Sequence, residues 1–164
     1  MIMKKKQLLL GLMMVLVLTG CAVSAEQLAE RARMSEQVTQ ELGSRHYKIM
    51  VHMMYPLRGT SVNVDGSSYS LEVKGDTLVS YLPYRGVARS VAYGGGSGLV
   101  FTSAISQYDV QKDRKGNTVV SFRSNSEDDQ FLFHVQVFPN GHATVDVSSR
   151  ERDPISFSGT LEVE

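Results

Sequence analysis

FLFHVQVFPNGHATVDV, residues 131–147, is the stretch that decides the fold. Apolar and polar residues alternate on both sides of Pro139-Asn140-Gly141, which is typical of two half-buried strands joined by a tight turn. Pro139 suits the second position of a type I turn, Asn140 the third, and Gly141 the left-handed residue of a bulge, so we expect a three-residue loop. That loop pairs apolar residues on one face: Phe133 with Val147, Val135 with Val145, and Val137 with Ala143.

A two-residue turn at Asn140-Gly141 is the alternative, and it would place Val135 opposite Asp146. Because a slip of one residue turns a whole face the wrong way, the apolar match favours the three-residue loop. On the other face, the favoured register places His134 beside Asp146. General bases use such carboxylate–histidine pairs, but opposite charges across an exposed sheet face are also an ordinary stabilising device.

The same alternation continues through most of the chain. From His46 onward the period is two, and Gly75-Asp76 suits a type II′ turn that would pair Val73 with Leu78. No helices are interleaved with the strands, which excludes parallel α/β folds. We therefore expect a mainly β chain, an antiparallel barrel or sandwich preceded by one N-terminal helix. Further strands are expected at Leu99–Val110, Asn117–Arg123, Phe131–Phe138, His142–Ser148 and Ile155–Val163.

The N-terminus has the pattern of a bacterial lipoprotein signal. Three lysines precede an apolar run that is too short to span a bilayer, and Leu18-Thr19-Gly20-Cys21 follows, which resembles a lipobox. We expect residues 1–20 to be removed and Cys21 to be acylated. Residues 21–45 would then form the lipidated N-terminus and a helical tether from Ser24 to Leu42 that packs weakly and ends at a left-handed Gly43, leaving 46–164 as a single antiparallel β domain.

Composition restricts the possible partners. Three of the 17 basic residues lie in residues 1–20, so the mature chain has 14 Lys and Arg against 17 Asp and Glu. This mildly acidic balance predicts no nucleic acid partner, and membrane association through the acyl chains of Cys21. The single cysteine excludes disulfides. Because Ala22 is not the aspartate associated with inner-membrane retention, we expect an envelope protein on the outer membrane, facing the periplasm.

Motifs that carry known chemistry are not evident in the sequence. It contains no nucleophile elbow, zinc-protease motif or phosphate loop, and the glycine-rich run before Leu99 leads into a strand, whereas an anion-binding loop leads into a helix. The sequence therefore predicts no enzyme and no cofactor. Residues 150–153, Arg-Glu-Arg-Asp, are expected to form a solvated loop before Pro154.

Two groups of residues are candidate sites. Met50, His52 and Met54 would share one face of the first strand, where thioether and imidazole groups suit copper; methionines that fill core gaps are the alternative. Aromatic and guanidinium side chains also crowd the exit of another strand. They would hold a small amphipathic or anionic ligand at a barrel mouth, or the tyrosines would simply plug the core. This second group comprises Tyr81, Tyr84, Arg85, Arg89 and Tyr93.

Several spaced blocks resemble the 4251 domain-of-unknown-function family, exported proteins and lipoproteins of Bacteroides-like bacteria. The blocks are residues 69–76 (YSLEVKGD), 81–88 (YLPYRGVA), 140–143 (NGHA) and 152–159 (RDPISFSG). The resemblance covers about residues 43–161. It implies a compact meander that closes into a lipocalin-like barrel, or a flattened barrel or sandwich, in the cell envelope, and it implies no activity.

The sequence thus predicts an envelope lipoprotein that is a non-enzymatic module for small-ligand binding or interaction. A structural envelope protein without a ligand is the main alternative. A copper-binding protein using Met50, His52 and Met54, and a hydrolase with an unrecognised site, are the others.

Overall fold

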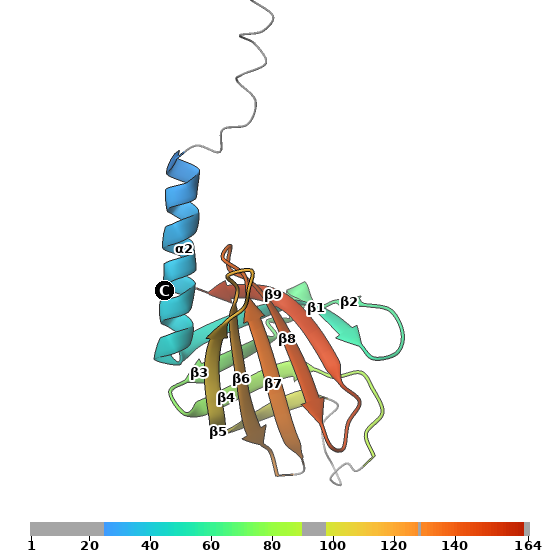
Figure 1. Ribbon diagram of the computed structural model, residues 1–164. Coiled ribbons are helices and arrows are strands. Elements are labelled where there is room, and N and C mark those ends of the chain that lie inside the picture. The colour runs from blue at the N-terminus through green and yellow to red at the C-terminus, as the bar shows by residue number, and fades with distance from the viewer. Residues whose placement is uncertain (1–24, 90–97, 128, 163–164) are drawn as a thin grey trace, which may run out of the picture. The chain divides into compact units, whose positions relative to one another are not determined.

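The computed structural model describes residues 25–89, 98–127 and 129–162 (Figure 1). Cys21 and Tyr93 lie outside the described residues. The chain divides into two compact units, Met1–Glu30 and Arg31–Glu164, and the second unit contains every strand. The elements are α2 (Ala25–Ser44), β1 (His46–Pro56), β2 (Val62–Asn63), the 3-10 turn η2 (Asp65–Ser67), β3 (Ser70–Lys74), β4 (Thr77–Pro83), β5 (Gly98–Lys112), β6 (Thr118–Asn125), β7 (Gln130–Val137), β8 (His142–Ser149) and β9 (Ile155–Glu162).

The strands form an antiparallel barrel. From β3 to β9 each strand pairs with the next along the chain, and β1 pairs with both β3 and β9, which closes a ring of eight strands. The two-residue strand β2 adds to β1 alone. Closure removes the unpaired edges that an open sheet would present to other chains. The predicted fold, a mainly β barrel with one N-terminal helix, is confirmed.

The β7–β8 hairpin has the predicted register. Val135 pairs with Val145 and His134 with Asp146. Gly141 has a φ of 81°, and its backbone N–H donates to the carbonyl of Phe138 at 2.9 Å. The β3–β4 hairpin also has the predicted pairing, with Gly75 at a φ of 61°. In both hairpins the turn residues and the apolar alternation specify the same register, which is why sequence reasoning succeeded there.

The barrel interior is filled by side chains. Phe122 and Phe133 stack with ring centroids 5.0 Å apart, and both are 0% exposed, as are Leu71 and Val135. A side chain with no accessible surface borders no void large enough for water. The interior around these residues therefore has no room for a ligand of the kind that lipocalins enclose.

The end of helix α2 belongs to this core. Val38 and Leu42 are 1% and 0% exposed, and the hydroxyl of Tyr108 donates to the carbonyl of Leu42 at 2.7 Å. The expectation of a weakly packed tether is therefore wrong for the last turns. No helix among the described residues is long and apolar enough to cross a membrane.

Helix α2 ends later than predicted. It runs through Gly43 to Ser44, and Arg45 takes the left-handed conformation with a φ of 58°. Tertiary contacts hold Arg45 there: its carbonyl accepts from the backbone of Gly75 at 2.7 Å, its guanidinium pairs with Asp76, and it lies 4.5 Å from the ring centroid of Tyr108. These contacts outweigh the preference of glycine for the position.

A β-bulge interrupts β1 opposite β9. Val51 pairs with Gly159 and Met53 with Ser158, so His52 is the extra residue and the strand changes phase. Consequently Met54 is buried in the core at 4% exposure. Gly159 permits this arrangement, because a Cβ atom there would lie 1.9 Å from the carbonyl oxygen of Met50.

Candidate functional site

The predicted mouth residues do not converge on one site. Tyr81 lies on the outer face of β4, 45% exposed, with its ring centroid 5.2 Å from that of Tyr69. Tyr84 instead connects the segment after β4 to the β8–β9 connection. Its hydroxyl lies within hydrogen-bond distance of the carbonyl of Val87, at 3.1 Å, and of that of Asp153, at 3.2 Å. Burial raises the pKa of Tyr84, and the Asp153 carboxylate raises it further. The remaining described members, Arg85 and Arg89, are exposed.

The segment that follows Tyr84 is attached to the β8–β9 connection. The N–H of Arg89 donates to the carbonyl of Glu151 at 2.7 Å, and Ala88 forms an isolated bridge with Arg152. These backbone contacts hold the segment after β4 against the β8–β9 connection. Neither sequence expectation describes Tyr81, which lies exposed on the outer face, while Tyr84 holds this segment to Asp153.

The proposed copper residues do not share a face. The bulge at His52 turns Met54 into the core, whereas Met50 stays half-buried on the outside. In the part of the chain that the structure describes, no three His, Cys, Asp or Glu side chains form a group that could hold a metal ion. The geometric premise of the copper hypothesis is therefore wrong.

His52 instead connects three segments in a way that sequence reasoning missed. Its Nδ1 lies against a carboxylate oxygen of Asp65, and its Nε2 lies 3.2 Å from the hydroxyl of Thr160. The order carboxylate, imidazole, hydroxyl resembles that of a nucleophile with its base and orienting group. In this structure the arrangement ties η2 and β1 to β9.

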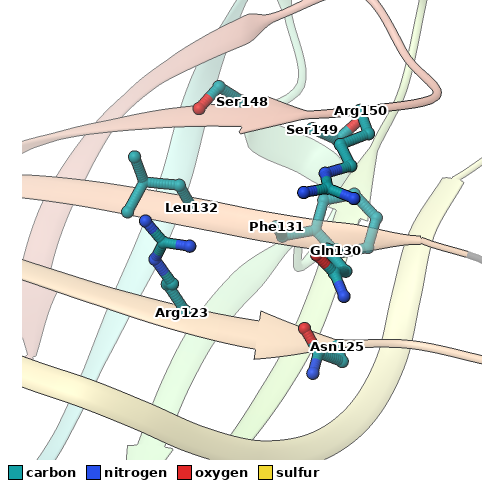
Figure 2. Close-up of a pocket in the computed structure, with 8 residues that line it drawn as sticks. All are labelled: Arg123, Asn125, Gln130, Phe131, Leu132, Ser148, Ser149 and Arg150. Atoms are coloured by element: carbon teal, nitrogen blue, oxygen red, sulfur yellow. The ribbon is translucent and has the colours of Figure 1, made fainter.

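The best candidate site is a hollow on the outside of the barrel, where β6 ends, β7 begins and β8 ends (Figure 2). We call it the first hollow. Strand pairing builds its floor: Arg123 lies opposite Leu132, and Leu132 lies opposite Ser148. The hollow has a volume of about 210 Å³ and is lined by Arg123, Asn125, Gln130, Phe131, Leu132, Ser148, Ser149 and Arg150.

Two guanidinium groups give the first hollow its chemistry. Figure 2 shows that Arg123 lies beside Leu132, while Arg150, directly after β8, reaches toward Phe131 and Gln130. Both arginines are exposed, and neither side chain forms a hydrogen bond or ion pair with any residue of the described ranges. Leu132, 43% exposed, adds an apolar surface beside Arg123. Guanidinium groups recognise carboxylate, sulfate and phosphate through paired N–H donors, so the arrangement suits an anion.

A second hollow adjoins the first. Its volume is about 450 Å³, it shares Asn125 and Phe131 with the first hollow, and it is also lined by Arg152 and Glu127. The Arg152 side chain is only 12% exposed and that of Asp129 only 1%, with 3.7 Å between Nε and a carboxylate oxygen. The expectation of a solvated loop at residues 150–153 is therefore wrong for Arg152. The remaining residues that line the second hollow are Gly98, Leu99, Val100, Phe101, Thr102 and Ser126.

Sequence reasoning missed these arginines because they are isolated in the sequence. Arg123 ends an ordinary alternating strand, and Arg150 sits in a run of mixed charge. Only the pairing of β6 with β7 and of β7 with β8 brings them to one hollow. The predicted register of the β7–β8 hairpin was the available signal. Because it pairs Phe133 with Val147, it also places Leu132 opposite Ser148 in the floor of the first hollow.

Comparison with known proteins agrees with the fold. The model of a family described as a domain of unknown function, DUF4251, matches residues 29–161. The crystal structure of a DUF4251 family protein from Bacteroides eggerthii is similar with a TM-score of 0.58 and 17% sequence identity, over 81% of this chain and 89% of that one. At this identity the likeness concerns the fold alone. No curated protein matches the chain.

Proposed function

This chain belongs to the DUF4251 family, a family of unknown function, and from that premise we propose that it is a non-enzymatic, lipid-anchored interaction module of the bacterial envelope. In this proposal the barrel is a rigid support, and a small anionic ligand binds outside it in the first hollow. The observation that carries the proposal is the pair of unpartnered guanidinium groups of Arg123 and Arg150 at one hollow.

The envelope location rests on the lipobox-like stretch before Cys21. We expect an acylated Cys21 as the first residue of the mature protein, held at the periplasmic face of the outer membrane. Two or three acyl chains exceed what stable anchoring requires. Mass spectrometry of the native N-terminus tests this, and an unmodified peptide spanning Gly20 and Cys21 would refute it.

The binding part of the proposal is tested with inorganic sulfate as the simplest anion. Sulfate titrated into the protein should shift amide NMR signals of Leu132 and Ser148, which line the first hollow together with the two arginines. Arg123→Gln and Arg150→Gln should each weaken the effect by about tenfold, since each removes one charged partner. Arg114→Gln, at an exposed arginine in the turn before β6, is the matched control and should change nothing.

A structural role without a ligand is the second candidate, and the filled barrel interior favours it. It predicts that sulfate shifts no signals around the first hollow, or that the shifts survive both arginine substitutions. Either result would refute the binding proposal.

A further inference from the structure

The two hollows at this end of the barrel form a continuous surface. Asn125 and Phe131 line both, so a ligand whose anionic group lies between Arg123 and Arg150 extends naturally past them into the second hollow. The inference below rests on the proposed function and concerns the chemical class of that ligand.

Arg152 supplies unused hydrogen-bond donors to the second hollow. Its guanidinium lies 5.5 Å from the ring centroid of Tyr84 and 3.7 Å from Asp129, and it makes no hydrogen bond with the residues that the structure describes. Its Nε and the Asp129 Oδ2 are both buried without a hydrogen-bond partner. Arg152 lines the second hollow, but its Nε is buried. A ligand would therefore hydrogen-bond to the two terminal NH2 groups of the guanidinium.

The charge in the second hollow does not suit another anion. Glu127 lines it beside Arg152, and the buried Asp129 carboxylate lies behind that arginine. A carboxylate only accepts hydrogen bonds and a guanidinium only donates them, while the Asn125 amide does both. A hydroxyl group donates and accepts hydrogen bonds at the same oxygen atom. It can therefore pair with the Glu127 carboxylate, the Arg152 guanidinium or the Asn125 amide.

The second hollow also has an apolar wall. Val100, which is 59% exposed, lines it, and so do Phe101 and Phe131, whose rings stack with centroids 5.0 Å apart. A ring of C–H groups that carries hydroxyls at its edge matches both the polar and the apolar lining. We therefore propose that the ligand is an acidic sugar: its carboxylate binds between Arg123 and Arg150, and a neighbouring neutral sugar binds beside Arg152, Glu127 and Asn125.

Calorimetry with four probes tests the proposal on the full mature chain. These are inorganic sulfate, glucuronate, the neutral disaccharide cellobiose, and cellobiouronate, a disaccharide of glucuronate and glucose. Cellobiouronate should bind at least tenfold more tightly than sulfate or glucuronate, because it alone fills both hollows. Cellobiose should bind most weakly, since it lacks the anion.

Substitutions separate the two hollows. Glu127→Gln should weaken cellobiouronate by about fivefold and leave sulfate unchanged, because Glu127 lines the second hollow and not the first. Arg123→Gln should weaken both probes.

Two results would overturn the acidic-sugar inference: cellobiouronate that binds no better than sulfate, or a Glu127→Gln variant that binds it more tightly, as a second anionic group would require. Sulfate binding that depends on Arg123 would still uphold the proposed function in either case. If sulfate does not bind at all, the proposed function itself fails.

Discussion

His134 and Asp146 lie directly opposite each other on β7 and β8, yet each side chain hydrogen-bonds to a serine on its other neighbouring strand. His134 Nδ1 lies 3.0 Å from the hydroxyl of Ser121 on β6, and the hydroxyl of Ser156 on β9 donates to Asp146. The pair is thus part of an exposed polar row across four strands.

Replacing His134 by Ala should therefore cost less than about 1 kcal/mol of unfolding free energy, as expected for one exposed cross-strand contact. Urea unfolding of the two proteins at neutral pH measures the difference. A loss of several kcal/mol would show that the row is far more strongly coupled than its exposure implies.

Gly141→Val should destabilise the β7–β8 hairpin by roughly 1 to 3 kcal/mol, because Gly141 has a φ of 81°, which a β-branched residue rarely adopts. Gly141→Asn is the matched control and should cost much less, since asparagine tolerates the left-handed region. Equal stabilities of the two variants, measured by urea unfolding, would contradict the assigned turn.

Gly159→Ala should cost about 3 kcal/mol, because the added Cβ would lie 1.9 Å from the Met50 carbonyl oxygen, and backbone cannot move aside as a side chain can. Gly43→Ala is the control: it lies in helix α2 with nothing within 4 Å of the new atom, and should stabilise by about 0.5 to 1 kcal/mol. Thermal unfolding of both variants tests the bulge, and a neutral Gly159→Ala would refute it.

Asp113 should make the β5–β6 turn sensitive to acid. Desolvation acts to raise the pKa of this carboxyl, but hydrogen bonds from Asn117, Lys115 and Gln136 outweigh it and lower the pKa below the ordinary 3.8. A depressed carboxyl pKa stabilises the fold above the unfolded value, and that contribution is lost as the pH falls through the folded value. Urea midpoints from pH 7 down to pH 2 should therefore fall less steeply below pH 4 for Asp113→Asn than for the native protein. Identical slopes would contradict this.

Tyr108→Phe should loosen the end of helix α2. The hydroxyl donates to the Leu42 carbonyl at 2.7 Å, and the loss of one such hydrogen bond costs about 1 kcal/mol. Amide hydrogen exchange should accelerate in residues 38–44 more than in β7. Equal acceleration in both places would mean that the helix end and the barrel unfold together.

The sequence by itself determined the elements whose signals are local. The β7–β8 hairpin could be read completely, because Pro139-Asn140-Gly141 and the apolar alternation specify one register. A run of such hairpins also implied an antiparallel barrel. Turn chemistry and the period of two act between neighbours in the chain, so they are visible without any knowledge of distant contacts.

Only the tertiary structure decided where the alternation breaks and which distant residues meet. The bulge at His52 depends on β9, where Gly159 admits the Met50 carbonyl, so no pattern within β1 indicates that Met54 turns inward. Val38 and Leu42 of α2 belong to a core built from distant strands, and Tyr108, 66 residues from Leu42, donates a hydrogen bond to its carbonyl. The first hollow exists because two strand pairings bring Arg123 and Arg150 to one surface. A guanidinium's function depends on what lies within a few ångströms of it, and chain separation does not encode that distance.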